Sequence, residues 1–125
     1  MASIRNPVTI LLVDDDESIR RFVRGILTDH RYQVIEAGDG AEALDFASAH
    51  QGPIHLLLTD IIMPKLNGLV LAERLAQQRS ETAVLFMSGY VEGRLVSANH
   101  SDAVLLQKPF TPDRLIEAVR AALDS

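Results

Sequence analysis

The 125-residue chain is long enough to form one domain with a core that needs no disulfide bonds, and it contains no cysteine. Its 12 Lys and Arg residues against 17 Asp and Glu residues give a formal net charge of −5, which argues against direct nucleic-acid binding. The longest apolar runs have the length of strands, and residues 1–10 lack the apolar core of a signal peptide. We therefore expect a soluble, cytoplasmic single domain, residues 1–125, with no output domain in this chain and no direct membrane contact.

The first half of the chain predicts two strands, each followed by a helix. Val8–Val13 is an apolar run of strand length that ends in four acidic residues, Asp14-Asp15-Asp16-Glu17. From Ser18 the apolar period becomes helical, with arginines on the other side, and Gln33–Ala37 is a short second strand. Asp39-Gly40-Ala41-Glu42 has the pattern of a capping box and opens a second helix. The residues that these two helices are expected to bury are Ile19, Phe22, Val23, Ile26, Leu27, Ala43, Leu44 and Ala47.

A third strand stands at the centre of the chain. Its apolar run starts at Ile54, after the chain-breaking pair Gly52-Pro53, and stops at a single carboxylate, Asp60, four residues before Pro64. A strand that is apolar on both faces belongs inside a covered parallel sheet, and open α/β sheets carry their chemistry at the carboxyl ends of such strands. Asp60 therefore stands where an active group would stand, although an acidic residue that only opens the next loop is an equal alternative.

The second half of the chain predicts two clear helices and two more strands. Asn67 can cap the first helix, and Thr111-Pro112 supplies an N-cap and a proline at the first helical position of the last one. The strands are Ala83–Met87 and Ala103–Gln107, and the residues between them, 90–101, only hint at a short helix. The residues that the two clear helices are expected to bury are Leu71, Ala72, Leu75, Ala76, Leu115, Ala118, Val119 and Ala122.

Strands and helices alternate along the chain, which predicts an α/β fold: a doubly wound, five-stranded parallel sheet with helices on both faces. Right-handed crossovers and the chain length favour the flavodoxin-like strand order 2-1-3-4-5. In this order the switch point lies between the first and third strands. Asp14 and Asp15 are therefore expected beside Asp60.

Four strands end in groups that can act together. The first ends in Asp14 and Asp15, the third in Asp60, the fourth in the hydroxyl of Ser88 and the fifth in the ammonium of Lys108. Carboxylates that share a crevice repel one another unless a cation neutralises them, and oxygen-only ligands favour a hard ion such as Mg²⁺, or Mn²⁺. A carboxylate can attack phosphorus to form an aspartyl phosphate, whose charge a metal ion and a lysine would balance. Each residue alone could be an ordinary turn or surface residue, but four such strand ends on one edge are harder to explain in that way.

The ordered set Asp14-Asp15, Asp60-x-x-Met63-Pro64, Ser88-Gly89 and Lys108-Pro109-Phe110 resembles the receiver domain of two-component response regulators over nearly the whole chain. The resemblance implies a CheY-like signalling switch in a phosphorelay. A sensor histidine kinase or a histidine phosphotransfer protein would transfer a phosphoryl group from phosphohistidine to Asp60.

The resemblance also implies roles for the other residues of the site. Mg²⁺ would be held by Asp14, Asp15, the Asp60 side chain and the Ile62 backbone carbonyl, while Lys108 and Ser88 would contact the phosphoryl group. The Lys108-Pro109 peptide could be cis. In this family the phosphodonor docks on the residues corresponding to Ser18, Ile19, Pro109 and Phe110.

Three further expectations follow from the resemblance. The domain would be a signalling domain rather than an enzyme, although it would catalyse phosphotransfer to Asp60 and hydrolysis from it. It would be a monomer or a weak homodimer. The segments 87–90 and 105–112 look most like receivers attached to hybrid histidine kinases, which leaves open whether the chain is free-standing or part of a longer kinase.

Two features depart from the pattern of the family. Many relatives carry Tyr or Phe three residues before the lysine, whereas this chain has Leu105, which can give neither a hydroxyl hydrogen bond nor a ring flip. We therefore expect Tyr90, or the weak helix of residues 90–101, to report phosphorylation instead. Ile62 and Tyr90 should flank the line of water attack on the acyl phosphate, which predicts slow self-dephosphorylation.

Other classes of protein remain as alternatives. A non-phosphorylated interaction module of the same fold should have lost the acids or the lysine. A haloacid dehalogenase-like phosphatase would use Asp14 as nucleophile and Asp16 as acid/base, but it needs a further acidic metal motif after its lysine. A flavin-binding electron carrier would need a loop of Ser, Thr and Gly in place of the four acids. Zinc is not expected, because the four histidines have no ligand spacing: His30, His50, His55 and His100.

Overall fold

The computed structural model describes residues 7–89, 94 and 103–124. The weak helix predicted in residues 90–101, together with Tyr90, lies outside the described residues apart from Arg94. Within the described part of the chain, no helix is long and apolar enough to cross a bilayer. The elements are β1 (Thr9–Val13), α1 (Glu17–Asp29), β2 (Gln33–Ala37), α2 (Gly40–Ala49), β3 (Leu56–Asp60), α3 (Gly68–Gln78), β4 (Ala83–Ser88), β5 (Leu105–Gln107) and α5 (Pro112–Asp124).

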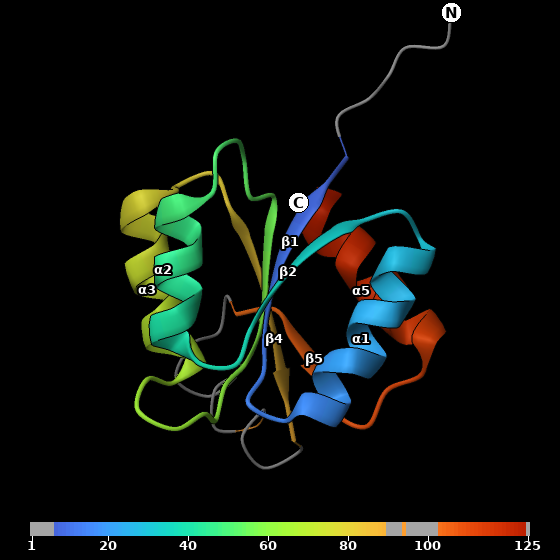
Figure 1. Ribbon diagram of the computed structural model, residues 1–125. Helices are drawn as coiled ribbons and strands as arrows, with labels where there is room; N and C mark the ends of the chain where they lie inside the picture. The colour runs from blue at the N-terminus through green and yellow to red at the C-terminus, as the bar shows by residue number, and fades with distance from the viewer. Residues whose placement is uncertain (1–6, 90–93, 95–102, 125) are drawn as a thin grey trace, which may run out of the picture.

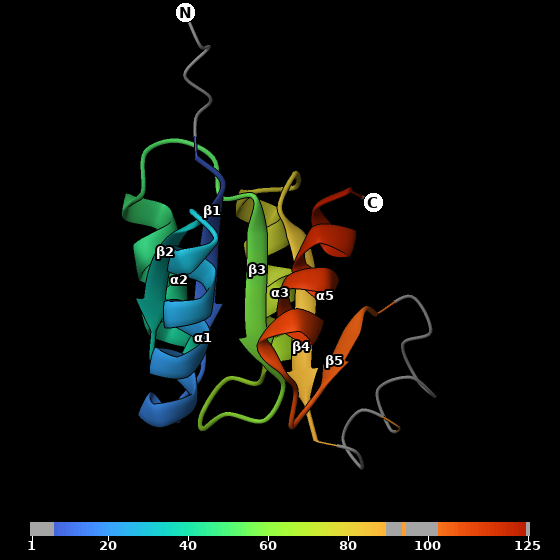
Figure 2. The same cartoon turned by 90° about the vertical axis from the view of Figure 1, so that its right-hand side faces the viewer.

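The strands form one parallel sheet in the order β2-β1-β3-β4-β5, which confirms the predicted topology. Figure 2 shows the sheet with its strands running in the same direction, so that all their carboxyl ends meet at one edge. The chain leaves β1 to form β2 on one side and returns to form β3 on the other. The switch point therefore lies between β1 and β3.

Helices cover both faces of the sheet, with α1 and α5 on one side and α2 and α3 on the other (Figure 1). Side chains of β1 alternate between the two layers: Ile10 and Leu12 pack towards α1 and α5, whereas Leu11 and Val13 pack towards α2 and α3. Because every residue of β1 is buried, the strand has no solvent-exposed face. This is the physical reason for the uninterrupted apolar run in the sequence.

The helices begin where the capping residues predict. Asp39, Asn67 and Thr111 each accept a hydrogen bond from the backbone N–H group three residues further on. Asp16 caps α1 in the same way, accepting from the N–H groups two and three residues further on. Each cap satisfies a backbone donor that the helix itself leaves free and contributes about 1 kcal/mol.

Two residues predicted on buried helix faces are exposed. Phe22 of α1 is 49% exposed, whereas Val23 and Leu27 of the same helix are fully buried. Ala76 of α3 is also exposed. Both predictions were wrong because helical periodicity shows which side of a helix faces the sheet, but not how wide a strip of that side the sheet buries. In α5 the buried stripe includes Ile116, which the sequence analysis did not assign to the core.

Candidate functional site

The register of the sheet brings the predicted residues together. Val13 pairs with Thr59, so Asp14, the next residue after β1, lies beside Asp60, the last residue of β3. Asp60 pairs with Met87, and Ser88 follows at the end of β4. Ser88 in turn pairs with Gln107, after which the chain continues to Lys108. Parallel pairing thus places residues that are far apart in the sequence at the same edge of the sheet.

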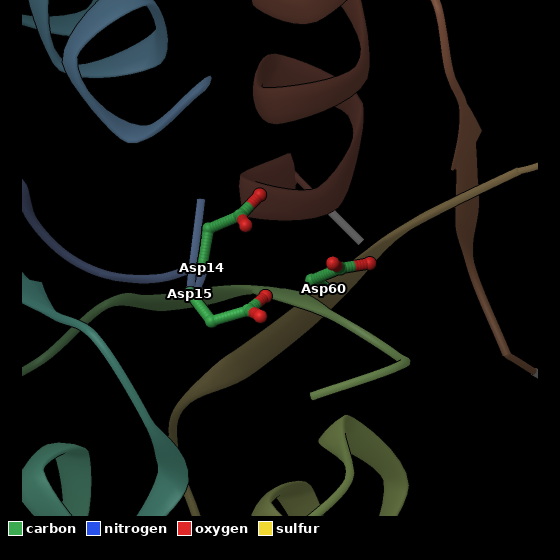
Figure 3. Close-up of side chains that lie close together, drawn as sticks. All are labelled: Asp14, Asp15 and Asp60. Carbon is green, nitrogen blue, oxygen red and sulfur yellow. The ribbon is translucent and has the colours of Figure 1, made fainter. Parts of the chain in front are cut away.

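Three carboxylates gather at the switch point between β1 and β3 (Figure 3). Asp14, Asp15 and Asp60 each offer one oxygen atom, and these atoms lie within 4.8 Å of one another. Asp14 is fully buried, the Asp60 side chain is 14% exposed, and Asp15 is exposed. A buried carboxylate beside two others requires positive charge nearby, and oxygen ligands of this kind suit Mg²⁺. The described residues therefore fit a hard divalent cation.

Lys108 supplies positive charge to the site. It follows β5, so it approaches Asp60 from the side of β3 that lies away from β1 and Asp14. Its Nζ atom lies 3.3 Å from Oδ2 of Asp14 and 3.3 Å from Oδ2 of Asp60. Burial acts to lower the pKa of Lys108, but the charges of Asp14 and Asp60 and the hydrogen bonds to them outweigh burial, so its pKa is raised. Lys108 is thus held as a cation that bridges the two carboxylates.

The carboxyl of Asp60 has a raised pKa. Burial is the largest cause, and the charge of Asp14 acts in the same direction. The charge of Lys108, its hydrogen bond to Asp60 and a bond from the Ile61 backbone oppose this rise without cancelling it. Only the ionised carboxylate is a nucleophile, and a cation bound beside Asp60 would favour that form.

Ser88, at the end of β4, completes the set of predicted residues at the strand ends. It is 2% exposed, and its Oγ atom has no hydrogen-bond partner among the described residues. A buried hydroxyl without a partner costs about 1–3 kcal/mol. Such a group is commonly satisfied by a ligand or an ordered water, and a phosphoryl oxygen on Asp60 would be a suitable acceptor.

The loop between β3 and α3 carries Ile62, whose side chain is 60% exposed. The carbonyl of Ile62 as a metal ligand stays a prediction. At the end of β5 the Lys108-Pro109 peptide is cis, in agreement with the family resemblance.

Gly68 is a residue of the site that the sequence analysis missed. It is the first residue of α3, and its N–H group donates to the Ile61 carbonyl over 2.8 Å. A Cβ atom at position 68 would lie 2.2 Å from the backbone oxygen of Asp60. Only a glycine therefore allows α3 to start this close to Asp60, and a glycine directly after an N-cap was the available signal.

The sheet topology and the acidic switch point together define a doubly wound α/β domain that carries its chemistry at the carboxyl edge of the sheet. A family model described as the response regulator receiver domain matches residues 10–120. The chain belongs to this family.

Individual proteins agree with this assignment. The response regulator receiver protein CpdR of Brucella abortus is 33% identical over 91% of this chain and 95% of its own length. The sensor kinase CckA of the same species is 30% identical over 93% of this chain, which spans only 12% of that kinase. The crystal structure of a response regulator receiver protein from Sinorhizobium medicae has a TM-score of 0.83 at 28% identity, covering 96% of this chain and 97% of that one.

The family assignment confirms the predicted class of function: a receiver domain of two-component signal transduction, with a phosphoacceptor role that fits the family. It is a signalling domain rather than an enzyme, and receiver domains of response regulators interact with histidine kinases. The phosphatase alternative finds no support, because Asp16 is exposed and its carboxylate caps α1.

Proposed function

We propose that Asp60 accepts a phosphoryl group from a phosphohistidine of a sensor histidine kinase or a histidine phosphotransfer protein. An oxygen atom of the Asp60 carboxylate attacks phosphorus as the phosphorus–nitrogen bond breaks, and the electron pair of that bond stays on the imidazole. The product is an acyl phosphate on Asp60. The observation that carries the proposal is the cluster of three carboxylates bridged by Lys108 at one sheet edge.

Each neighbour of Asp60 then has a task. Asp14, Asp15, the Asp60 carboxylate and the Ile62 carbonyl would hold Mg²⁺, with Mn²⁺ as a substitute, and the ion would supply positive charge for the phosphoryl oxygens. Lys108 exchanges part of its contact with Asp60 for one with the phosphoryl group, and Ser88 donates its free hydroxyl hydrogen. Because these contacts form only in one arrangement of the domain, phosphorylation biases a two-state equilibrium.

The partner is a phosphohistidine protein that docks beside this edge. Ser18 and Ile19 at the start of α1 lie next to the acidic loop in the chain, and Pro109 and Phe110 follow Lys108 directly. Such a partner works in the cytoplasm, and the domain itself is a monomer or a weak homodimer. The match to the sensor kinase CckA supports a place for this domain within a longer kinase, whereas the match to CpdR supports a free-standing protein.

The proposal is tested by intact mass and peptide mapping after incubation with Mg²⁺ and acetyl phosphate. The native chain should gain a single phosphoryl group on Asp60, and the gain should disappear in Asp60→Asn and when Mg²⁺ is chelated. Asp14→Asn should label much more slowly. If neither acetyl phosphate nor a phosphohistidine donor labels the folded protein, the domain is an interaction module of the same fold, whereas label on Asp14 would point to phosphatase-like chemistry.

A further inference from the structure

We propose that Arg20 is a positioning residue for the metal site, and that it acts by fixing the peptide group between Asp14 and Asp15. The inference rests on the proposed function, which gives Arg20 no role. The sequence analysis placed the arginines of this helix on its outer side. Arg20 instead turns inward from the first turns of α1, and its side chain is only 19% exposed.

Two edges of the Arg20 guanidinium are used by different partners. Its Nη1 atom donates to the backbone carbonyl of Asp14 over 2.7 Å, and its Nε atom lies 3.3 Å from Oε1 of Glu36 on β2. A Cβ atom at position 38 would lie 3.6 Å from Nη1, so the guanidinium packs against the chain at Gly38 as well. The planar guanidinium is thereby held between the end of β1 and the end of β2.

The bond to the Asp14 carbonyl completes a set of contacts that hold Asp14 in place. The Asp14 N–H group donates to the Ala37 carbonyl over 3.2 Å. One carboxylate oxygen accepts from the Asp16 N–H group over 2.9 Å, and the other pairs with Lys108 over 3.3 Å. The carbonyl is the remaining polar group of this fully buried residue, and Arg20 binds it.

The position of this carbonyl matters because it belongs to the peptide plane that joins Asp14 to Asp15. The planarity of the peptide bond links the carbonyl of Asp14 rigidly to the N–H group of Asp15. If the carbonyl lost its donor, this plane could rotate, and the exposed carboxylate of Asp15 would move relative to the buried one of Asp14. Arg20 therefore sets the spacing of two of the proposed metal ligands without touching either carboxylate.

A charge effect and a positioning effect of Arg20 predict opposite results. If Arg20 acted only through its positive charge, removing that charge would strengthen the binding of a cation nearby. If Arg20 acts by positioning, removing it should weaken the binding. Outer contacts that orient metal ligands typically contribute about tenfold or more to affinity.

The experiment is a calorimetric titration of the metal-free protein with MgCl₂ at constant ionic strength. Arg20→Met should raise the Kd for Mg²⁺ about tenfold. Arg20→Lys should also raise it, because a single ammonium keeps the charge but cannot reproduce the two-edged contact. Arg24→Met is the matched control: Arg24 lies 3.4 Å from Oε2 of the same Glu36, is 52% exposed, and should leave the Kd within about twofold of the native value.

A second readout separates positioning from general damage to the fold. At low Mg²⁺ the Arg20 variants should label slowly with acetyl phosphate, and saturating Mg²⁺ should restore most of the native rate. A Kd for Arg20→Met that is unchanged, lowered or matched by Arg24→Met would overturn the inference. If Arg20→Met does not fold, Arg20→Lys decides the question in the same way. Absence of Mg²⁺ binding by the native chain would instead remove the proposed function itself, and this inference with it.

Discussion

At Asp60, burial and the two charged neighbours act in different directions on the carboxyl group. Burial raises its pKa, the charge of Lys108 lowers it and that of Asp14 raises it, and the net shift is upward. The folded protein therefore holds a proton on Asp60 at pH values where the unfolded chain, with an ordinary pKa of 3.8, has already released it. Ionised Asp60 thus opposes folding of the metal-free protein.

This shift predicts a pH dependence of stability. As the pH rises from the ordinary value through the raised one, native protein should lose free energy of unfolding relative to Asp60→Asn, and the difference should level off above the raised value. Urea denaturation of both proteins in a metal chelator, from pH 4.5 to pH 8, measures it. Lys108 stays protonated throughout this range, so it adds only a constant offset. A native protein that gains stability relative to the variant as the pH rises would contradict the prediction.

A second prediction at the residue scale concerns Gly68. Gly68→Ala should destabilise the fold by about 1–3 kcal/mol and slow the labelling of Asp60, because the new Cβ atom forces the Asp60 carbonyl to move. Gly25→Ala is the control, since Gly25 lies at an exposed position of α1 and a Cβ atom there meets nothing within 4 Å. That change should stabilise the helix by about 0.5–1 kcal/mol. Urea midpoints and phosphorylation rates of the two variants test both statements, and equal behaviour would refute them.

At the scale of elements, one arginine ties two helices of the same face together. Arg79, the C-cap of α3, donates to the carbonyls of Ala47 and His50 at the end of α2 over 3.0 and 2.7 Å, and to that of Gly52 over 2.7 Å. The carbonyls of Ala47 and His50 have no donor within the helix, because α2 ends here, so the guanidinium closes the end of α2.

We expect Arg79→Met to lower the free energy of unfolding by about 1–3 kcal/mol, because three charge-assisted hydrogen bonds are lost. Arg74→Met changes the same residue type at an exposed position of α3 and should alter stability by less than about 0.5 kcal/mol. Chemical denaturation compares the two. Similar losses in both variants would show that the Arg79 contacts contribute little.

A further prediction concerns Ile62, in the loop from β3 to α3, and the lifetime of the phosphorylated form. Ile62 is 60% exposed two residues after Asp60, where an apolar side chain should hinder the in-line approach of water. Ile62→Asn should shorten the lifetime of the acyl phosphate by about threefold or more, which corresponds to roughly 0.7 kcal/mol of the barrier.

Loss of the acid-labile phosphoryl group, followed by mass spectrometry after the donor is removed, measures this lifetime. Val104→Asn is a matched control, because Val104 is also apolar and 46% exposed but lies before β5, at the opposite end of that strand from Lys108. An unchanged lifetime in Ile62→Asn would count against a shielding role for Ile62.

For the molecule as a whole, we expect the acidic edge to oppose folding until a cation binds there. One oxygen of each of three carboxylates lies within 4.8 Å of the others, and in the described part of the chain the ammonium of Lys108 contacts two of these carboxylates. A ligand that binds only the folded state adds stability by mass action, about 1.4 kcal/mol at ten times its Kd. Mg²⁺ at that concentration should therefore raise the melting temperature by about 5 °C.

A thermal melt in MgCl₂, against NaCl of the same ionic strength, measures this shift. Asp15→Asn removes an exposed ligand without opening the core and should lose most of the shift. Equal stabilisation by the two salts would indicate screening of charge rather than a bound ion.

Leu105 stands at the position where many relatives carry an aromatic switch residue. Leu105 of β5 packs in a small cluster with Ile61 and Phe86, directly beside the proposed phosphoacceptor. A change at Asp60 can therefore reach β5 through apolar contacts without an aromatic switch residue. The predicted role of Tyr90 concerns a residue outside the described ones and stays a prediction.

Much of the fold and the site was readable from the sequence. Uninterrupted apolar runs predicted buried parallel strands, caps at Asp39, Asn67 and Thr111 predicted helix starts, and the alternation predicted the strand order. Once that order is accepted, Asp14, Asp60, Ser88 and Lys108 must share an edge, because parallel strands end on the same side. These features depend on local pattern and topology, which the chain carries within itself.

Only the tertiary structure decided which side chains turn inward and how closely the backbones approach. The burial of Arg20 depends on Glu36 and the Asp14 carbonyl, which lie outside α1. The exposure of Phe22 depends on how much of the surface of α1 packs against the sheet. The need for glycine at position 68 appears only when the start of α3 is set against the Asp60 carbonyl. Periodicity and spacing describe one element at a time, whereas these properties arise from packing between elements.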